Sequence, residues 1–162
     1  MAEIFSEAEL KALREAEEKD YPWDPKLARL AGHEFAKLVF GPEFRRGHPT
    51  PSVIVGVGAV GTQLALETWK DQQARPWPPD WRWAEVDALG VPRLESPISR
   101  GHAVIVGGSL LPDEQLTALV RQIRAEHATI SDMAVVVGEN WPLGQPSAAR
   151  ALGLVLHPLI TG

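Results

Sequence analysis

The chain has 162 residues, of which 44% are hydrophobic and 23% are charged, and its formal net charge is −5. These values are typical of one soluble globular domain with a hydrophobic core of its own. The negative charge argues against a general nucleic-acid binder, which would carry a basic face, and no apolar run approaches the roughly 18 residues of a membrane span. The lack of cysteine excludes disulfides, thiolate nucleophiles and cysteine metal sites.

The amino-terminal sequence MAEIFSEAEL is acidic and helical, unlike a signal peptide, so we expect a cytoplasmic protein. The lack of cysteine, the 14 prolines and the excess of arginine over lysine would also suit a thermophile. The five histidines are scattered along the chain and form no spaced cluster, so the sequence predicts no metal site.

The first fifty residues predict two helices. Ser6 and Glu9 have the spacing of a capping box at the start of the first helix. Asp24-Pro25 opens the second helix, apolar residues follow at helical spacing, and Gly41 can end it. We expect residues 1–50 to form a helical segment packed on the core, although the sequence does not decide whether the first helix covers its own domain or a neighbour.

From Ser52 onward, predicted strands alternate with predicted helices. The apolar strands are typical of a parallel sheet covered on both faces, whose binding sites lie beyond the carboxyl ends of the strands. The proline-rich stretch RPWPPDWRW favours an irregular segment, and WAEVDAL and VPRL are weak strand candidates. We therefore expect an α/β core over residues 51–162, within a single domain. The predicted strands are 52–56, 102–106, 133–137 and 154–160, and the predicted helices are 62–72, 115–125 and 147–152.

Three glycines follow the first predicted strand in a G-x-G-x-x-G pattern, Gly56, Gly58 and Gly61. Such a turn lets backbone amides approach an oxyanion at a helix start. One interpretation is a dinucleotide-binding site, but the next ~20 residues bring ARPWPPDWRW instead of a second buried strand ending in an acid. The alternatives are a phosphate-facing turn in another fold, or a tight turn that binds nothing.

Three segments taken together resemble a known family: VIVGVGAVGTQLALE, RGHAVIVGGSLLPDEQLTALVRQIRAEHATISDMAVVVGE and ARALGLVLHPLITG. Their order and spacing resemble the type I phosphoribosyltransferases, most closely the orotate phosphoribosyltransferases. The resemblance implies a phosphoribosyltransferase-like parallel sheet flanked by helices, and a homodimer. It also implies transfer of ribose phosphate from phosphoribosyl pyrophosphate to a nitrogen base, with magnesium.

The resemblance assigns each site residue by position. The pyrophosphate-facing turn would comprise Gly56, Val57, Gly58, Ala59, Val60, Gly61 and Thr62. A degenerate ribose-phosphate site would comprise Gly107, Gly108, Ser109, Leu111, Pro112, Asp113, Glu114 and Gln115. A base pocket would lie near Glu139, Asn140 and Trp141.

The chain departs from the family where the substrate's charges would lie. Gly107 and Gly108 replace two acids that hold the ribose hydroxyls, and Pro112 lacks an amide hydrogen in the phosphate loop. Asp113 and Glu114 would repel a phosphate by about 1 kcal/mol in water and about 4 kcal/mol at an intermediate dielectric for a pair ~4 Å apart. The two acids also suit the first turn of a helix. Glu139 stands where the orotate branch has a base-binding arginine.

The segment between Trp81 and Arg100 falls on a mobile, lysine-bearing loop of the orotate branch. Here it contains Arg82 and Arg93 but no lysine. Trp77, Trp81 and Trp83 could form a base-stacking wall, a subunit interface, or packing for a long loop.

These observations lead to three functional hypotheses. The first is a phosphoribosyltransferase-like protein that lacks transferase activity and acts in binding or regulation, with a small-molecule or nucleotide ligand. The second is an active phosphoribosyltransferase of nucleotide metabolism with an unusual phosphate site. The third is a dinucleotide-binding protein. We expect no cofactor under the first hypothesis and magnesium under the second, with neither nucleic acid nor a membrane as partner.

Overall fold

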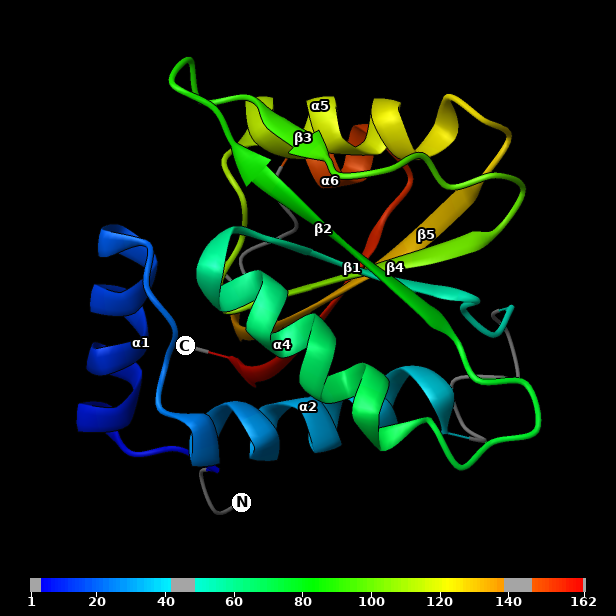
Figure 1. Cartoon of the computed structure of the whole chain (residues 1–162). Helices are drawn as coiled ribbons and strands as arrows, with labels where there is room; N and C mark the ends of the chain where they lie inside the picture. The colour runs from blue at the N-terminus through cyan, green and yellow to red at the C-terminus, as the bar shows by residue number, and fades with distance from the viewer. Residues whose placement is uncertain (1–3, 42–48, 139–146, 162) are drawn as a thin grey trace.

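The computed structural model describes residues 4–41, 49–138 and 147–161, and Figure 1 shows their arrangement. Among these residues, no helix is both long and apolar enough to cross a membrane. The helices are α1 (Glu7–Lys19), α2 (Pro25–Phe40), α4 (Gly58–Asp71), α5 (Asp113–Arg124) and α6 (Ser147–Ala151). The strands are β1 (Val53–Val57), β2 (Asp80–Val86), β3 (Pro92–Leu94), β4 (His102–Gly107), β5 (Thr129–Gly138) and β6 (Val155–Thr161).

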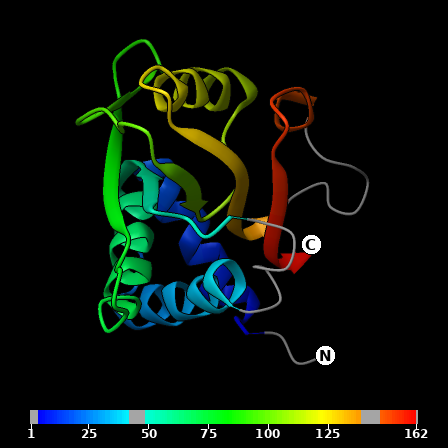
Figure 2. The same ribbon diagram turned by 90° about the vertical axis from the view of Figure 1, so that its right-hand side faces the viewer.

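Within the described residues, the six strands form one sheet in the order β3-β2-β1-β4-β5-β6. Every neighbouring pair is parallel except β2 and β3, which are antiparallel. Figure 2 shows β2 and β6 on opposite sides of the molecule. From β1 the chain continues to β2 and β3 on one side of the sheet, and it then returns to form β4, β5 and β6 on the other side. The order in which strands are added therefore reverses between β1 and β4. Ligand sites of open α/β sheets lie beyond the carboxyl ends of strands at such a point.

Helices cover both faces of the sheet. α1, α2 and α4 pack on one face, and α5 and α6 pack on the other (Figure 1). Alternate residues of β1 serve the two cores, since Ile54 belongs to the first and Val53 and Val55 to the second. This confirms the predicted parallel sheet flanked by helices, and it explains why the central strands are apolar throughout.

Both amino-terminal helices begin where their capping residues predict. Ser6 and Glu9 form the reciprocal hydrogen bonds of a capping box at α1. The Asp24 carboxylate accepts hydrogen bonds from two amides in the first turn of α2. Leu13 and Ala16 of α1 are fully buried in the core shared with α2 and α4. The first helix therefore covers its own core, a choice that the sequence left open.

Several predicted boundaries are wrong, and two of these errors bear on the site. α4 begins at Gly58 rather than at Thr62, so most of the predicted glycine turn is the first turn of a helix. β2 begins at Asp80, directly after the prolines, within a stretch predicted to be irregular. Pro79 precedes the strand, so it costs no hydrogen bond inside it. The structure confirms the weak strand candidates as β2 and β3.

Gly56 is required for the close approach of α4 to β1. A Cβ atom at this position would lie 2.0 Å from the carbonyl oxygen of Gly61. Both glycines therefore serve packing between the strand and the helix, whatever the turn binds. Gly107 differs, because a Cβ there would lie 3.5 Å from its nearest contact, the Ser109 carbonyl oxygen.

We expect Gly56→Ala to destabilise the fold by at least about 2 kcal/mol, because backbone atoms must move to admit the methyl group. Gly107→Ala should change the free energy of unfolding by far less and is the matched control. Urea denaturation of both variants measures the difference. Equal stability of the two variants would contradict the packing role of Gly56.

Candidate functional site

A cleft of about 840 Å³ opens at the carboxyl ends of β1 and β2. One wall is the start of α4, from Gly58 to Thr62, and another is the loop that leads from Ser109 into α5. The end of β2 supplies a third wall. The carboxyl end of α1 and the residues after it close the cleft on the remaining side. It therefore lies where the topology predicts a site.

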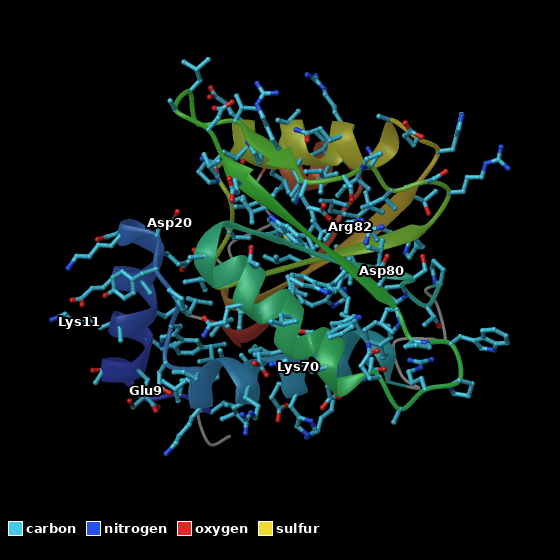
Figure 3. All side chains as sticks on the ribbon, viewed as in Figure 1. Glu9, Lys11, Asp20, Lys70, Asp80 and Arg82 are labelled. Atoms are coloured by element: carbon cyan, nitrogen blue, oxygen red, sulfur yellow. The ribbon has the colours of Figure 1, made fainter. Side chains whose placement is uncertain are left out.

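The carboxylate of Asp20 caps the amino terminus of α4. Its Oδ1 accepts a hydrogen bond of 2.9 Å from the Ala59 amide. α4 has no side-chain cap of its own, because Val57 occupies its N-cap position. Figure 3 shows Asp20 at the end of α1 that faces the start of α4. A carboxylate from elsewhere in the chain thus occupies the helix end that favours negative charge.

A second carboxylate of α1 lies over the turn that follows β4. Glu17 Oε2 accepts a hydrogen bond of 3.0 Å from the Ser109 hydroxyl. The Glu17 carboxyl carbon lies so close to Gly108 that a Cβ there would be 2.9 Å from it. The space left between Glu17 and the ends of β1 and β4 is about 20 Å³. That volume holds about one water molecule, so a phosphate does not fit.

Trp23 and Gln63 fix the end of α1 against α4. The Gln63 side-chain amide donates to the Trp23 carbonyl and accepts from the Trp23 amide, both at 2.8 Å. The Trp23 indole donates to the carbonyl of Glu9 and lies 5.1 Å from the Phe5 ring, centroid to centroid. These contacts hold Glu17 and Asp20 at the mouth of the cleft.

The wall formed by β2 is aromatic and acidic. Trp83 and Glu85 line the cleft, and Trp83 continues a row of rings that runs through Trp81 to Trp69. Trp81 and Trp83 belong to strand β2, and Trp81 contacts Trp69 of α4, which differs from simple loop packing. Trp77 is separate from them, since it precedes β2 and is 89% exposed.

The structure brings together only some of the predicted site residues. Those that line the cleft are Val57, Gly58, Ala59, Val60, Thr62, Ser109, Leu111, Pro112 and Gln115. Gly56 and Gly61 are buried beneath it, and Gly107 and Gly108 line the small space under Glu17. Asp113 and Glu114 are exposed in the first turn of α5 and are not part of the cleft wall. Glu139, Asn140 and Trp141 lie outside the described residues.

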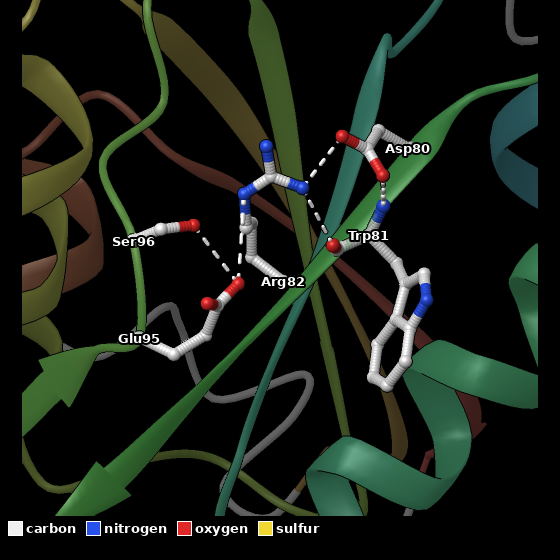
Figure 4. Close-up of polar contacts among 5 residues, drawn as sticks. All are labelled: Asp80, Trp81, Arg82, Glu95 and Ser96. Atoms are coloured by element: carbon white, nitrogen blue, oxygen red, sulfur yellow. Dashed lines mark hydrogen bonds and ion pairs between the residues drawn. The ribbon is translucent and has the colours of Figure 1, made fainter.

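The arginines between Trp81 and Arg100 pair with neighbouring carboxylates. Figure 4 shows the Arg82 guanidinium between Asp80 and Glu95. Arg93 donates to Asp87 at 2.8 Å, in the hairpin that joins β2 and β3. Arg100 precedes β4 and so lies at the amino end of that strand, opposite the cleft. Neither Arg82, Arg93 nor Arg100 lines the cleft.

Solved phosphoribosyltransferase structures share this architecture. A phosphoribosyltransferase from Corynebacterium diphtheriae is 17% identical over 94% of this chain and 90% of its own, with a TM-score of 0.63. Adenine phosphoribosyltransferase from Thermoanaerobacter pseudethanolicus is 11% identical over 85% of this chain and 81% of its own, at 0.60. Orotate phosphoribosyltransferase from Mycobacterium tuberculosis, in complex with 5-phospho-α-D-ribosyl 1-diphosphate, is 19% identical over 85% and 78%, at 0.55. The chain has the type I phosphoribosyltransferase fold.

At these low sequence identities, the similar structures establish only that this chain shares the phosphoribosyltransferase fold. No protein-family model matches the sequence. No curated protein matches it significantly. The fold confirms the resemblance in architecture, and the orotate and adenine enzymes are both among the similar structures. The chemistry must therefore be argued from the residues of the cleft.

The described residues offer few ligands for the magnesium that the phosphoribosyltransferase fold implies. Magnesium prefers oxygen ligands, often carboxylates shared with substrate phosphates. Gly107 and Gly108 bring no side-chain oxygen, and no group of three acidic or histidine side chains in the described part of the chain is arranged to hold a metal. The Glu17 and Asp20 carboxylates instead accept hydrogen bonds from Ser109 and Ala59.

Sequence reasoning missed two acids of the cleft, Glu17 and Asp20, and considered the third, Glu85, only as a late acid for the dinucleotide interpretation. One signal was available. Glu17 and Asp20 lie at the carboxyl end of a helix, where the helix dipole disfavours negative charge. A local preference violated twice in one turn indicates that tertiary contacts hold these residues. Nothing in the sequence shows that their partners would be Ala59 and Ser109.

We expect Arg93→Gln to raise the pKa of the Asp87 carboxyl. That pKa lies below its ordinary value, first because Asp87 accepts the Val91 amide and next because it pairs with Arg93. In the variant, the pKa of Asp87 should still lie below its ordinary value, because the hydrogen bond from the Val91 amide remains. A carboxyl-carbon NMR titration measures it, with Arg100→Gln as the control.

The same pair sets a pH dependence of stability. A lowered folded-state pKa stabilises the fold above the unfolded pKa of about 3.9, and the contribution is lost as pH falls through the folded value. Wild type and Arg93→Gln should therefore differ most above pH ~4 and converge in stronger acid. An unchanged Asp87 titration in Arg93→Gln would show that Arg93 is not engaged with Asp87.

Proposed function

We propose that this protein uses the phosphoribosyltransferase fold for binding or regulation and transfers no phosphoribosyl group. Its cleft would hold a small molecule that carries no phosphate. One observation supports this most directly. The described residues that line the cleft include the acids Glu17, Asp20 and Glu85 and no lysine, arginine or histidine.

The charge of the cleft opposes a phosphorylated substrate. Phosphoribosyl pyrophosphate carries several negative charges, and each close carboxylate costs about 1 to 4 kcal/mol, depending on the dielectric. A working site would instead supply charge-assisted hydrogen bonds worth roughly 1.5–3 kcal/mol each. Losing several such bonds and adding repulsion would weaken binding by several powers of ten.

The source of the repulsion differs from the one that the sequence suggests. Asp113 and Glu114 are exposed outside the cleft, whereas Glu17 and Asp20 reach it from α1. Pro112 occupies the N-cap position of α5 and supplies no amide there. The loop after β4 thus has one amide fewer at Pro112, and α1 supplies acids in addition.

The dinucleotide hypothesis meets the same obstacle. Its pyrophosphate would need the amides at the start of α4, and the Ala59 amide is bonded to Asp20. A ligand without phosphates could instead contact the ring of Trp83 and the apolar residues Leu110 and Leu111 of the cleft. We also propose that the protein is a homodimer, for which the 89% exposed Trp77 would be a suitable contact.

Thermal denaturation with magnesium and phosphoribosyl pyrophosphate tests the proposal. A ligand at a hundredfold excess over its dissociation constant would stabilise the fold by about 2.7 kcal/mol. We expect magnesium with phosphoribosyl pyrophosphate to shift the melting temperature no more than the control, which is magnesium chloride with sodium pyrophosphate. We also expect no release of pyrophosphate when orotate or adenine is added as the acceptor. Stabilisation together with pyrophosphate release would establish an active transferase and overturn the proposal.

Restoring the two acids after β4 should not restore activity. We expect Gly107→Asp/Gly108→Asp to release no pyrophosphate, because Pro112 still supplies no amide and Glu17 and Asp20 still line the cleft. Gly108→Asp should also lower the melting temperature, since its Cβ would meet the Glu17 carboxyl at 2.9 Å. Gly107→Asp alone is the control, because a Cβ there has room. Turnover by the double variant would contradict this assignment of the loop.

A further inference from the structure

A groove on the outer side of α2 lies apart from the cleft. Its first part, of about 600 Å³, lies between the first half of α2 and the carboxyl end of α4. Its second part, of about 310 Å³, continues past the end of α4 to the end of α2. Asp71 lines both parts, so they are contiguous, and we call them together the α2–α4 groove. None of the described residues that line this groove also lines the cleft.

The α2 wall of the groove is one stripe of side chains. Its members recur at intervals of three or four residues, which places them on one side of the helix. They are Lys26, Leu30, His33 and Lys37. At a rise of about 1.5 Å per residue, the stripe is ~16 Å long. The two helices touch beneath it, because a Cβ atom on Gly32 would lie 2.7 Å from the Cβ atom of Glu67.

The α2–α4 groove is basic although the protein is acidic. The described residues that line it include five lysines and arginines and two acids, whereas the whole chain has a formal net charge of −5. Both acids have partners within the groove, since Lys70 lies 3.4 Å from Glu67 and His33 lies 2.9 Å from Asp71. Figure 3 shows Lys70 where α4 meets α2. The groove therefore carries more positive charge than its own acids neutralise.

The excess charge is concentrated near the amino end of α2. Within the residues that the structure describes, neither Lys26 nor Arg29 pairs with a carboxylate, and both are exposed. The first turn of α2 contains no acid, although the helix dipole favours acids there and disfavours Lys26. These cations therefore do not serve the stability of their own helix. Leu30 lies beside them and is 38% exposed, so the same end of the groove also offers an apolar contact.

We propose that the α2–α4 groove docks an acidic segment of a partner protein. Carboxylates of that segment would pair with Lys26 and Arg29, and an apolar side chain of the segment would cover Leu30. Complementary charge steers a partner to such a surface, and salt screens the attraction between exposed charges. The docking surface is separate from the cleft, so this inference does not depend on the function proposed for the cleft.

The groove favours a polypeptide over a nucleic acid. Each nucleotide carries a phosphate, and nucleic-acid binding depends on many contacts of lysine and arginine with successive phosphates. Here Glu67 and Asp71 stand among the cations and would repel a continuous run of phosphates. A protein segment can place carboxylates opposite Lys26 and Arg29 and uncharged side chains opposite the two acids.

Three variants separate charge, position and apolar contact. Lys26→Gln/Arg29→Gln removes the two cations that have no carboxylate partner in the described part of the chain. Lys11→Gln/Arg121→Gln is the matched control, because it makes the same change in net charge at exposed positions outside the groove. Leu30→Ala removes the apolar contact and leaves every charge in place.

The probe is a fluorescent peptide of about twelve residues, long enough to cover the ~16 Å stripe as a helix, made of glutamates with a few leucines. Fluorescence anisotropy measures its binding at ~50 mM salt, where surface charges are weakly screened. We expect the wild type to bind this peptide and to bind its glutamine analogue and an oligothymidylate of equal length more weakly. Lys26→Gln/Arg29→Gln should weaken binding by about fivefold or more, as for the loss of two exposed charge pairs, and the control by less than about twofold.

The leucines of the probe test the apolar contact. Leu30→Ala should weaken binding of the leucine-containing peptide by about threefold, and it should leave binding of an all-glutamate peptide unchanged, because only the first loses buried apolar area. Arg29→Lys keeps the charge and should retain binding of both peptides. Circular dichroism verifies that each variant is folded, and the single variant Arg29→Gln replaces the double variant if the latter unfolds.

Three results would overturn the inference. The first is a folded wild type that does not bind the acidic peptide at ~50 mM salt. The second is an equal loss of binding in Lys11→Gln/Arg121→Gln, which would mean that only the net charge of the protein matters. The third is tighter binding of the oligothymidylate than of the peptide, which would assign the groove to a nucleic acid. None of these results bears on the function proposed for the cleft, which is tested by phosphoribosyl pyrophosphate.

Discussion

The docking of the carboxyl end of α1 on the amino end of α4 decides what the cleft presents to a ligand. The Gln63 side chain holds the Trp23 backbone by two hydrogen bonds, and Asp20 bonds to the Ala59 amide. Buried contacts of Leu13 and Ala16 hold the rest of the helix against the core. Moving α1 would expose the donors of both turns at once. The site's charge thus depends on residues far from the strands that form its floor.

The fold and the chemistry of this protein can be separated. The mostly parallel sheet and the helices that flank it match the phosphoribosyltransferase fold, and these features depend on apolar burial over the whole sheet. The substrate chemistry of a site depends instead on a few polar groups at the strand ends. Replacing such groups with Gly107, Gly108 and Pro112 leaves the packed layers intact. The packed layers of such a fold therefore do not depend on which polar groups stand at the strand ends.

The glycines after β1 illustrate the same separation within a single motif. Gly56 and Gly61 have a packing function, because α4 approaches β1 so closely that a side chain at Gly56 would meet the backbone of Gly61. Gly58 has a conformational function at φ 73°. Each glycine is accounted for without a bound nucleotide. A glycine-rich turn between strand and helix is therefore weak evidence for phosphate binding when considered alone.

The sequence by itself determined the class of fold. Capping residues such as Ser6 and Asp24 predict helix starts because their partners lie within one turn, and runs such as 103–106 predict buried strands because both faces must be apolar. The family resemblance also predicts that Gly107 and Gly108 stand where the family has two acids. Sequence reasoning misplaced the start of α4, because a helix that begins at a glycine with positive φ has no sequence signal that distinguishes it from a loop. Only the tertiary structure decided that Asp113 and Glu114 lie outside the cleft while Glu17 and Asp20 reach it. The physical reason is that long-range contacts determine which donor a distant carboxylate meets, and local sequence patterns carry no information about that pairing.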